Sequence, residues 1–155
     1  MENKKEIFNL PLWEELPDIE LYMDQLIGYL EKKLSFLNEE EDEKFITSTM
    51  INNYVKKKII LAPEKKKYNK EHLAYLFIII TLKRVFTISQ ISSLIKNITK
   101  EDEISVAYNN FCYQMKNAYD FVFDTKENKE FVKNDTALYN ASLAYAYKMY
   151  TEKLL

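Results

Sequence analysis

The chain has 155 residues, of which 47% are apolar, 14% aromatic and 30% charged. This length favours one or two compact domains, and this apolar content is too high for a disordered chain. One glycine and three prolines exclude collagen-like and low-complexity chains and argue against a turn-rich β protein. We therefore expect a mainly α fold. A single cysteine cannot form an internal disulfide, which is typical of a reducing compartment.

No segment suggests export or membrane insertion. The N-terminal residues, MENKKEIFNLPLWEELPD, are charged at both ends and lack the continuous apolar run of a secretory signal. The longest apolar run, LAYLFIIITL from Leu73 to Leu82, is much shorter than the roughly 20 residues that a spanning helix needs. We expect a cytoplasmic protein without a membrane partner.

The charge is distributed unevenly along the chain, although the net charge is only −2. Residues 1–46 hold 5 basic and 13 acidic side chains, whereas residues 47–84 hold 9 basic and 2 acidic ones. Residues 85–155 are nearly neutral, with 8 basic and 9 acidic side chains. A chain with this asymmetry can present a strongly positive face despite its acidic balance.

Caps, prolines and hydrophobic period predict the first elements in chain order. Residues 1–17 contain Pro11, Trp13 and Pro17, which are rigid or bulky, and suggest an extended arm. After Asp18, apolar residues at steps of three and four, beginning with Ile19, Tyr22 and Met23 and ending with Leu37, predict the first helix. The acidic residues 39–43 suggest a solvated connector. Thr47, Ser48 and Thr49 offer cap oxygens for a second helix that ends near Ile59, and residues 61–68 suggest a turn or a short two-stranded wing.

The second half of the chain predicts four further helices. Residues 70–85, capped by Asn69, are apolar around almost the whole circumference, which places that helix at the centre. Thr87 and Gln90 form a capping-box pattern that opens a helix to residue 98. Thr99 with Asp102 predicts the start of a long helix that reaches Val122. Asp135 is the expected cap of a last helix with two apolar sides, which suggests packing against the preceding helix and against a second protomer.

The residues available for catalysis are few. One histidine and one cysteine exclude most metal-ligand clusters and nucleophile–base pairs, and one glycine, Gly28, leaves no phosphate-binding loop. Carboxylate pairs such as Glu39/Glu43 and Glu101/Glu103 are typical of solvated faces. We expect Cys112 to be a buried structural thiol and His72 to serve a helix terminus. The sequence therefore predicts no enzyme, no catalytic residue, no metal site and no cofactor.

The second predicted helix separates polar from apolar residues. At roughly 100° per residue, its apolar side chains fall on one side and its amides and lysines fall within an arc of about 140° on the other. Asparagine can donate and accept at an adenine edge in the major groove, and lysine reaches phosphate or guanine. The alternative interpretation is a lysine-rich solvated surface in a chain with a compositional bias toward lysine. The candidate DNA-contacting residues are Asn52, Asn53, Lys56, Lys57, Lys65, Lys66, Lys67 and Tyr68.

The stretch TMINNYVKKKIILAPEKKKYNKEHLAYLFIIITLKRVFTISQISSLI, residues 49–95, resembles the winged helix-turn-helix of MerR-like transcriptional regulators. Residues 50–54 match the recognition helix, Pro63 the turn, residues 65–68 the wing and residues 87–94 the final short helix. Asn52 stands where that pattern has arginine, and Lys58 where it has glycine. The whole chain, including LPLWEELPDIELYMDQ from Leu10 and the MINNYVK string, also resembles a family of uncharacterised Gram-positive bacterial proteins with a domain of unknown function.

These observations support two hypotheses. The first is a dimeric DNA-binding transcriptional regulator with an N-terminal arm over residues 1–17, a winged helix-turn-helix domain over 18–98, and a C-terminal helical hairpin over 99–155. The resemblance implies that this hairpin forms a homodimer, and a small-molecule effector is possible there. The alternative is a protein-interaction or ligand-sensing module that keeps the winged scaffold without binding DNA. If residues 39–43 cover the basic face, the alternative is favoured.

Overall fold

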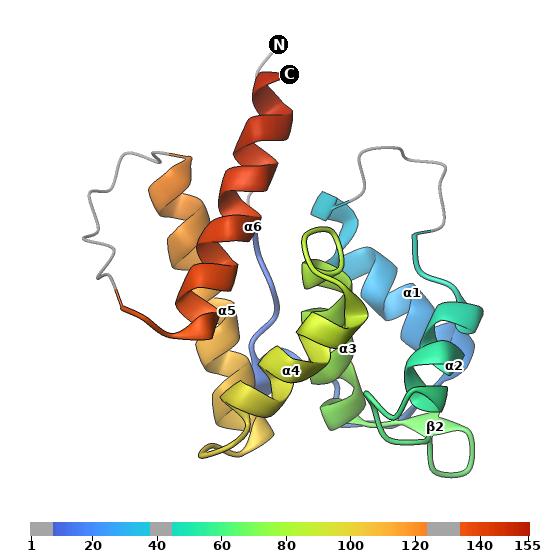
Figure 1. Ribbon diagram of the computed structural model, residues 1–155. Helices are drawn as coiled ribbons and strands as arrows, with labels where there is room; N and C mark the ends of the chain where they lie inside the picture. Colours follow the sequence, from blue (N-terminus) through green and yellow to red (C-terminus); the bar gives the residue numbers. More distant parts are fainter. Residues whose placement is uncertain (1–7, 38–44, 124–133) are drawn as a thin grey trace. The chain divides into compact units, whose positions relative to one another are not determined.

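The computed structural model describes residues 8–37, 45–123 and 134–155. This part of the chain is mainly helical, with six α-helices and a two-stranded sheet (Figure 1). The chain forms two compact units, Met1–Leu73 and Ala74–Leu155. The boundary between the two units falls within α3 (Lys70–Leu82), whereas the sequence predicted that the winged domain would end at residue 98.

The N-terminal segment of the first unit is packed and only partly extended. Phe8, Leu10 and Leu16 are each less than 7% exposed, so this segment contributes to the core. It contains a short 3₁₀ turn, η1 (Trp13–Glu15), which is closed by a hydrogen bond from the Leu12 N–H to Glu15 Oε2 at 2.7 Å. The expectation of a purely extended arm therefore needs correction.

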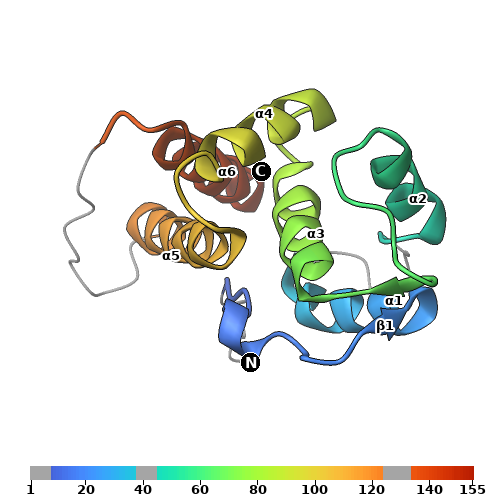
Figure 2. The same ribbon diagram turned by 90° about the horizontal axis from the view of Figure 1, so that it is seen from below.

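The first helix begins later than its apolar period predicted. Residues Leu21–Tyr22 form strand β1, which pairs antiparallel with β2 (Lys67–Tyr68), and α1 spans Met23–Lys33 (Figure 2). The Tyr22 N–H donates to Gln25 Oε1 at 3.0 Å and marks the helix start. Ile19 is 70% exposed and lies outside the helix. The strand pairing, which links residues far apart in sequence, overrides the local period. A second 3₁₀ turn, η2 (Ser35–Leu37), follows α1.

Helix α2 (Ser48–Lys56) is close to its prediction. Thr47 is its N-cap, and Thr47 Oγ1 accepts a hydrogen bond from the Met50 N–H at 3.2 Å. The helix ends three residues before the predicted Ile59, because the chain turns into the left-handed region at Lys58. Ile51 and Tyr54 are buried and fix α2 to the core of the first unit.

In the second unit, α3 and α4 agree well with the sequence. The apolar residues of α3 are buried from Leu73 to Leu82, except the half-buried Tyr75, as expected of a central helix. Helix α4 (Ile88–Ile98) has the predicted capping box: the Gln90 N–H donates to Thr87 Oγ1, and the Thr87 N–H donates to Gln90 Oε1. Thr99 does not cap the next helix. Its hydroxyl donates to the Ile95 carbonyl at 2.7 Å, so it belongs to the end of α4.

Helices α5 (Ile104–Val122) and α6 (Ala137–Leu154) pack side by side (Figures 1 and 2). Glu103 and Thr136 are their N-caps, in place of the predicted Thr99 and Asp135. Their C-terminal ends meet: the ring centroids of Phe123 and Tyr150 are 5.2 Å apart, and Lys153 Nζ lies 5.6 Å from the Phe123 centroid. The two helices are therefore parallel, whereas the helices of the expected C-terminal helical hairpin would be antiparallel, so that expectation is wrong.

The length of the connection explains the parallel arrangement. An antiparallel helical hairpin is usually joined by a loop of about 2–5 residues. Thirteen residues, 124–136, separate Phe123 from the first residue of α6, and such a chain can span about 43–47 Å. The connection is long enough to return along α5 before α6 begins.

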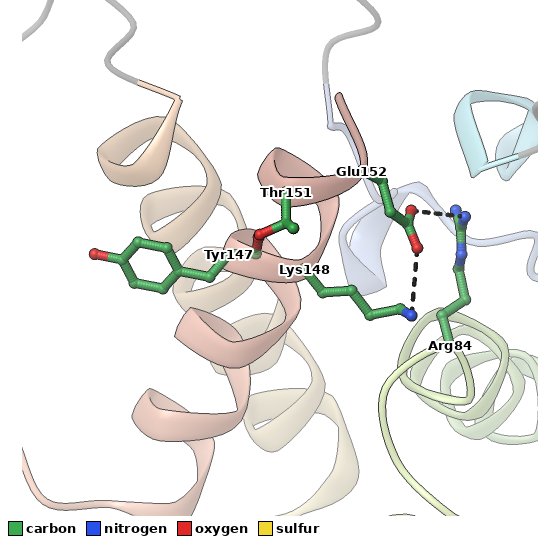
Figure 3. Close-up of polar contacts among 5 residues, drawn as sticks. All are labelled: Arg84, Tyr147, Lys148, Thr151 and Glu152. Carbon is green, nitrogen blue, oxygen red and sulfur yellow. Dashed lines mark hydrogen bonds and ion pairs between the residues drawn. The ribbon is translucent and has the colours of Figure 1, made fainter. Parts of the chain in front are cut away.

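An ion-pair network joins the end of α6 to the segment after α3. Glu152 accepts from Arg84 at 3.4 Å and from Lys148 at 3.3 Å, as Figure 3 shows. Tyr147 points to the other side of α6 and is 52% exposed. The single arginine of the chain is thus engaged within the second unit.

Candidate nucleic-acid interface

The polar face of α2 is exposed as the sequence predicted. Asn52, Asn53, Lys56 and Lys57 all lie on the surface, opposite the buried Ile51 and Tyr54. Within the described part of the chain, these four side chains make no hydrogen bond or ion pair with another protein group. Their amide and ammonium groups are thus available to a ligand.

Lys58 extends this face beyond the end of α2. The Lys58 N–H donates to the Val55 carbonyl at 2.9 Å, and the Ile59 N–H donates to the Tyr54 carbonyl at 3.0 Å. This pair of bonds is the Schellman motif, which needs a left-handed residue and usually has glycine there. Lys58 adopts φ = 56° at this position and its side chain is exposed. A lysine therefore occupies the backbone position that glycine adopts at lower free energy.

Two more left-handed lysines form the tip of a β-hairpin. Glu64 and Lys67 form a bridge, and the Lys67 N–H donates to the Glu64 carbonyl at 2.9 Å. The two residues between them, Lys65 and Lys66, have φ angles of 49° and 65°. Positive φ at both central residues is the requirement of a type I′ turn, for which Asn-Gly is the favoured sequence. Both lysine side chains are exposed. In Figure 1 this hairpin lies just below the C-terminal end of α2.

The last two predicted contact residues, Lys67 and Tyr68, are less exposed than the other six. Lys67 Nζ lies 5.4 Å from the centroid of the Tyr22 ring, a cation–π contact across the two strands. Tyr68 is only 2% exposed, and its ring packs edge to face against His72 with centroids 5.3 Å apart. Burial raises the pKa of the Tyr68 hydroxyl. Tyr68 is therefore not part of the candidate surface, because its ring belongs to the core beneath the hairpin.

His72 fixes the segment between α2 and the hairpin. The Asn69 N–H donates to His72 Nδ1 at 3.0 Å, and the His72 N–H donates back to Asn69 Oδ1 at 3.1 Å, which caps α3. With Nδ1 as acceptor, Nε2 carries the proton and donates to the Leu61 carbonyl at 3.1 Å. The side chain is 6% exposed. His72 therefore has the structural role that the sequence suggested, and it also holds the chain that leads into the hairpin.

The positive charge of residues 47–84 is divided between the two units. Lys83 and Arg84 belong to the second unit, where burial lowers the pKa of Lys83. In the first unit, Lys70 is engaged by Asp18 at 3.1 Å and by the ring of Trp13 at 5.4 Å. What remains is an exposed set that we call the lysine–asparagine surface, made of Asn52, Asn53, Lys56, Lys57, Lys58, Lys65 and Lys66.

The sequence around this surface is almost free of acidic residues. Between residues 45 and 70, the only carboxylate is Glu64, which is exposed at the start of the hairpin. The acidic residues 39–43, whose position would separate the two sequence-based hypotheses, lie outside the described residues. Lys58 was not among the predicted contacts. The signal that could have identified it is a lysine at a helix end where the resembling pattern has glycine.

Other kinds of site have little support. In residues 8–37, 45–123 and 134–155, no three histidine, cysteine or acidic side chains gather where a metal ion could bind. Cys112 is 4% exposed and lies in the core of the second unit. None of the helices described here has the length and hydropathy needed to cross a membrane.

Comparison with known proteins gives a family without an assigned activity. No curated protein and no solved structure matches the chain. One family model, described as a domain of unknown function (DUF1836), matches residues 11–122. The match extends from the N-terminal segment to the last residue of α5 and includes the whole lysine–asparagine surface. Because it covers well over half of the 155 residues, the chain belongs to the DUF1836 family.

Proposed function

We propose that the protein binds double-stranded DNA through the lysine–asparagine surface and acts as a transcriptional regulator. The observation that carries this proposal is the backbone of Lys58, Lys65 and Lys66. All three lysines adopt left-handed conformations that cost on the order of 1 kcal/mol each compared with glycine. Strained residues of this kind cluster at functional sites. Their exposed ammonium groups offer a reason for the strain, since phosphate contacts supply most of the non-specific affinity for DNA.

The order of elements along residues 23–82 supports a winged helix-turn-helix of the MerR-like kind. Helix α1 is followed by α2, then by the hairpin at Lys65 and Lys66, and then by α3. Strand β2 of the hairpin is tied to β1 before α1. In this proposal α2 enters the major groove and the hairpin lies along the flanking phosphates, as in winged regulators.

We also propose that two copies act together through α5 and α6. Helix α2 has only nine residues and can contact few base pairs, so a second copy would double the interface. Val106, Tyr113 and Phe121 are about half exposed and lie along one side of α5. An uncharged stripe of this kind suits association with a second copy.

The test of DNA binding is fluorescence anisotropy with a labelled random duplex across salt concentrations from about 50 to 200 mM. We compare the wild-type chain with Lys65→Glu/Lys66→Glu. The matched control is Lys96→Glu/Lys100→Glu, which makes the same charge change at two exposed lysines of the second unit. We expect wild type and control to bind with a steep salt dependence. The Lys65→Glu/Lys66→Glu variant should bind at least tenfold more weakly and lose about two units of the salt slope.

Two results would overturn the proposal. One is the absence of binding by the wild-type chain at the lowest salt. The other is an equal loss of affinity in both double variants, because it would show that only net charge matters. The first result favours the alternative, a protein-interaction module, for which the exposed Tyr113 and Phe121 of α5 are the specific observation. The second result removes the lysine–asparagine surface as the binding site.

A further inference from the structure

The amides of α2 offer a second kind of contact in addition to phosphate binding. Asn52 and Asn53 are exposed, and neither side chain has a hydrogen-bond partner among the described residues. A carboxamide donates and accepts at once, which matches the N6 donor and the N7 acceptor of adenine in the major groove. The two amides precede Lys56 and Lys57 by one helical turn. They are therefore nearer the N-terminal part of the helix, which in helix-turn-helix proteins contacts the bases.

The group best suited to guanine is missing from this surface. Arginine, bidentate to O6 and N7 of guanine, makes the commonest specific base contact. The chain has a single arginine, Arg84, and the second unit engages it with Glu152 at 3.4 Å. The cations of the lysine–asparagine surface are all lysines, which can bond guanine in the major groove but, as point charges on flexible stems, suit phosphate better. Lys56 and Lys57 lie at the end of α2, and Lys65 and Lys66 lie on the hairpin.

We infer that the lysine–asparagine surface prefers A·T over G·C base pairs opposite α2 and reads them in the major groove. This inference rests on the proposed DNA binding. The lysines supply affinity without sequence preference, and Asn52 and Asn53 supply the preference.

The experiment measures the affinity of the full chain for an A·T-rich duplex, a G·C-rich duplex, and the A·T-rich duplex with 7-deaza-adenine. Removal of N7 deletes an acceptor in the major groove only. We expect about tenfold tighter binding to the A·T-rich duplex, and loss of this difference with 7-deaza-adenine. The Asn52→Ala/Asn53→Ala variant should lose the preference but keep salt-dependent binding. The control Asn97→Ala, at an exposed asparagine of α4 in the second unit, should keep both.

The outcomes separate this inference from the proposal on which it rests. Salt-dependent binding with equal affinity for both duplexes overturns the A·T preference and leaves DNA binding intact. A preference that survives 7-deaza-adenine overturns major-groove reading by N7. No binding to any duplex overturns both. The modified duplex tests the wild-type chain, so a folding defect of the variant cannot hide the answer.

Discussion

Substitution of Lys58 and Lys66 by glycine distinguishes an effect on the stability of the fold from an effect on DNA binding. Both occupy left-handed positions where glycine is more stable. We expect Lys58→Gly/Lys66→Gly to raise the free energy of unfolding by about 1–2 kcal/mol. The same variant should weaken DNA binding several-fold, because it removes two exposed cations. Urea unfolding and anisotropy measure the two effects. A stabilised variant with unchanged affinity would show that the lysines are merely tolerated.

His72, in contrast to these lysines, has a structural role. Its Nε2 donates to the Leu61 carbonyl, and its Nδ1 accepts from the Asn69 N–H. His72 itself is only 6% exposed. His72→Ala leaves both partners without their bonds and opens a space beside Tyr68. We expect a loss of about 2–3 kcal/mol in the free energy of unfolding.

The check is urea unfolding of His72→Ala beside Asn69→Ala. The Asn69 variant removes the cap but keeps the bond to Leu61, so it should cost only about 1 kcal/mol. A change below about 0.5 kcal/mol in His72→Ala would mean that water replaces both bonds at no cost.

At the scale of the elements, features that depend on residues close together in the sequence were predicted correctly. The Thr47 cap, the Thr87–Gln90 capping box and the buried run of α3 are confirmed, because each depends on residues close together in sequence. The start of α1 was placed too early, since the pairing of Leu21 with Tyr68 joins distant residues. The amides and lysines of α2 are exposed as predicted. The left-handed lysines were missed, because backbone strain has no signature in composition or period.

The apolar pattern also could not predict the direction of α6 relative to α5. A helix has the same apolar stripe whether its neighbour is parallel or antiparallel. The contact of Phe123 with Tyr150 settles it, since it joins the two C-terminal ends. From Ala137 to Tyr150, α6 rises about 20 Å, and the connection has to return by that distance.

A deletion tests this geometry. Removal of residues 124–133, which lie outside the described part, leaves three connecting residues, and the four Cα steps from Phe123 to Ala137 then reach only about 13–14 Å. That is too short for a parallel pair, so we expect the thermal midpoint to fall by several degrees or the second unit to lose cooperative unfolding. Replacement of the same residues by an equally long Gly/Ser segment is the control. Unchanged stability of the deletion variant would contradict the parallel arrangement.

At the scale of the whole molecule, the net charge of −2 works against DNA binding, so one copy of a nine-residue helix has little affinity to spare. Two copies double the number of phosphate contacts, and the salt slope grows with that number. We therefore expect the chain to sediment at twice its mass of 18.6 kDa under conditions where it binds DNA. Tyr113→Glu/Phe121→Glu should give the single-chain mass and a salt slope about half as steep.

A control for that variant is Ile19→Glu, which introduces one glutamate in place of two, at a side chain of the first unit that is 70% exposed. It adds a negative charge without touching α5 and should leave the sedimenting mass unchanged. Sedimentation velocity and anisotropy on the same samples connect assembly to binding. If the wild-type chain binds DNA while sedimenting as a single copy, α5 is not the partner surface. The steep salt dependence must then come from the five lysines of one lysine–asparagine surface alone.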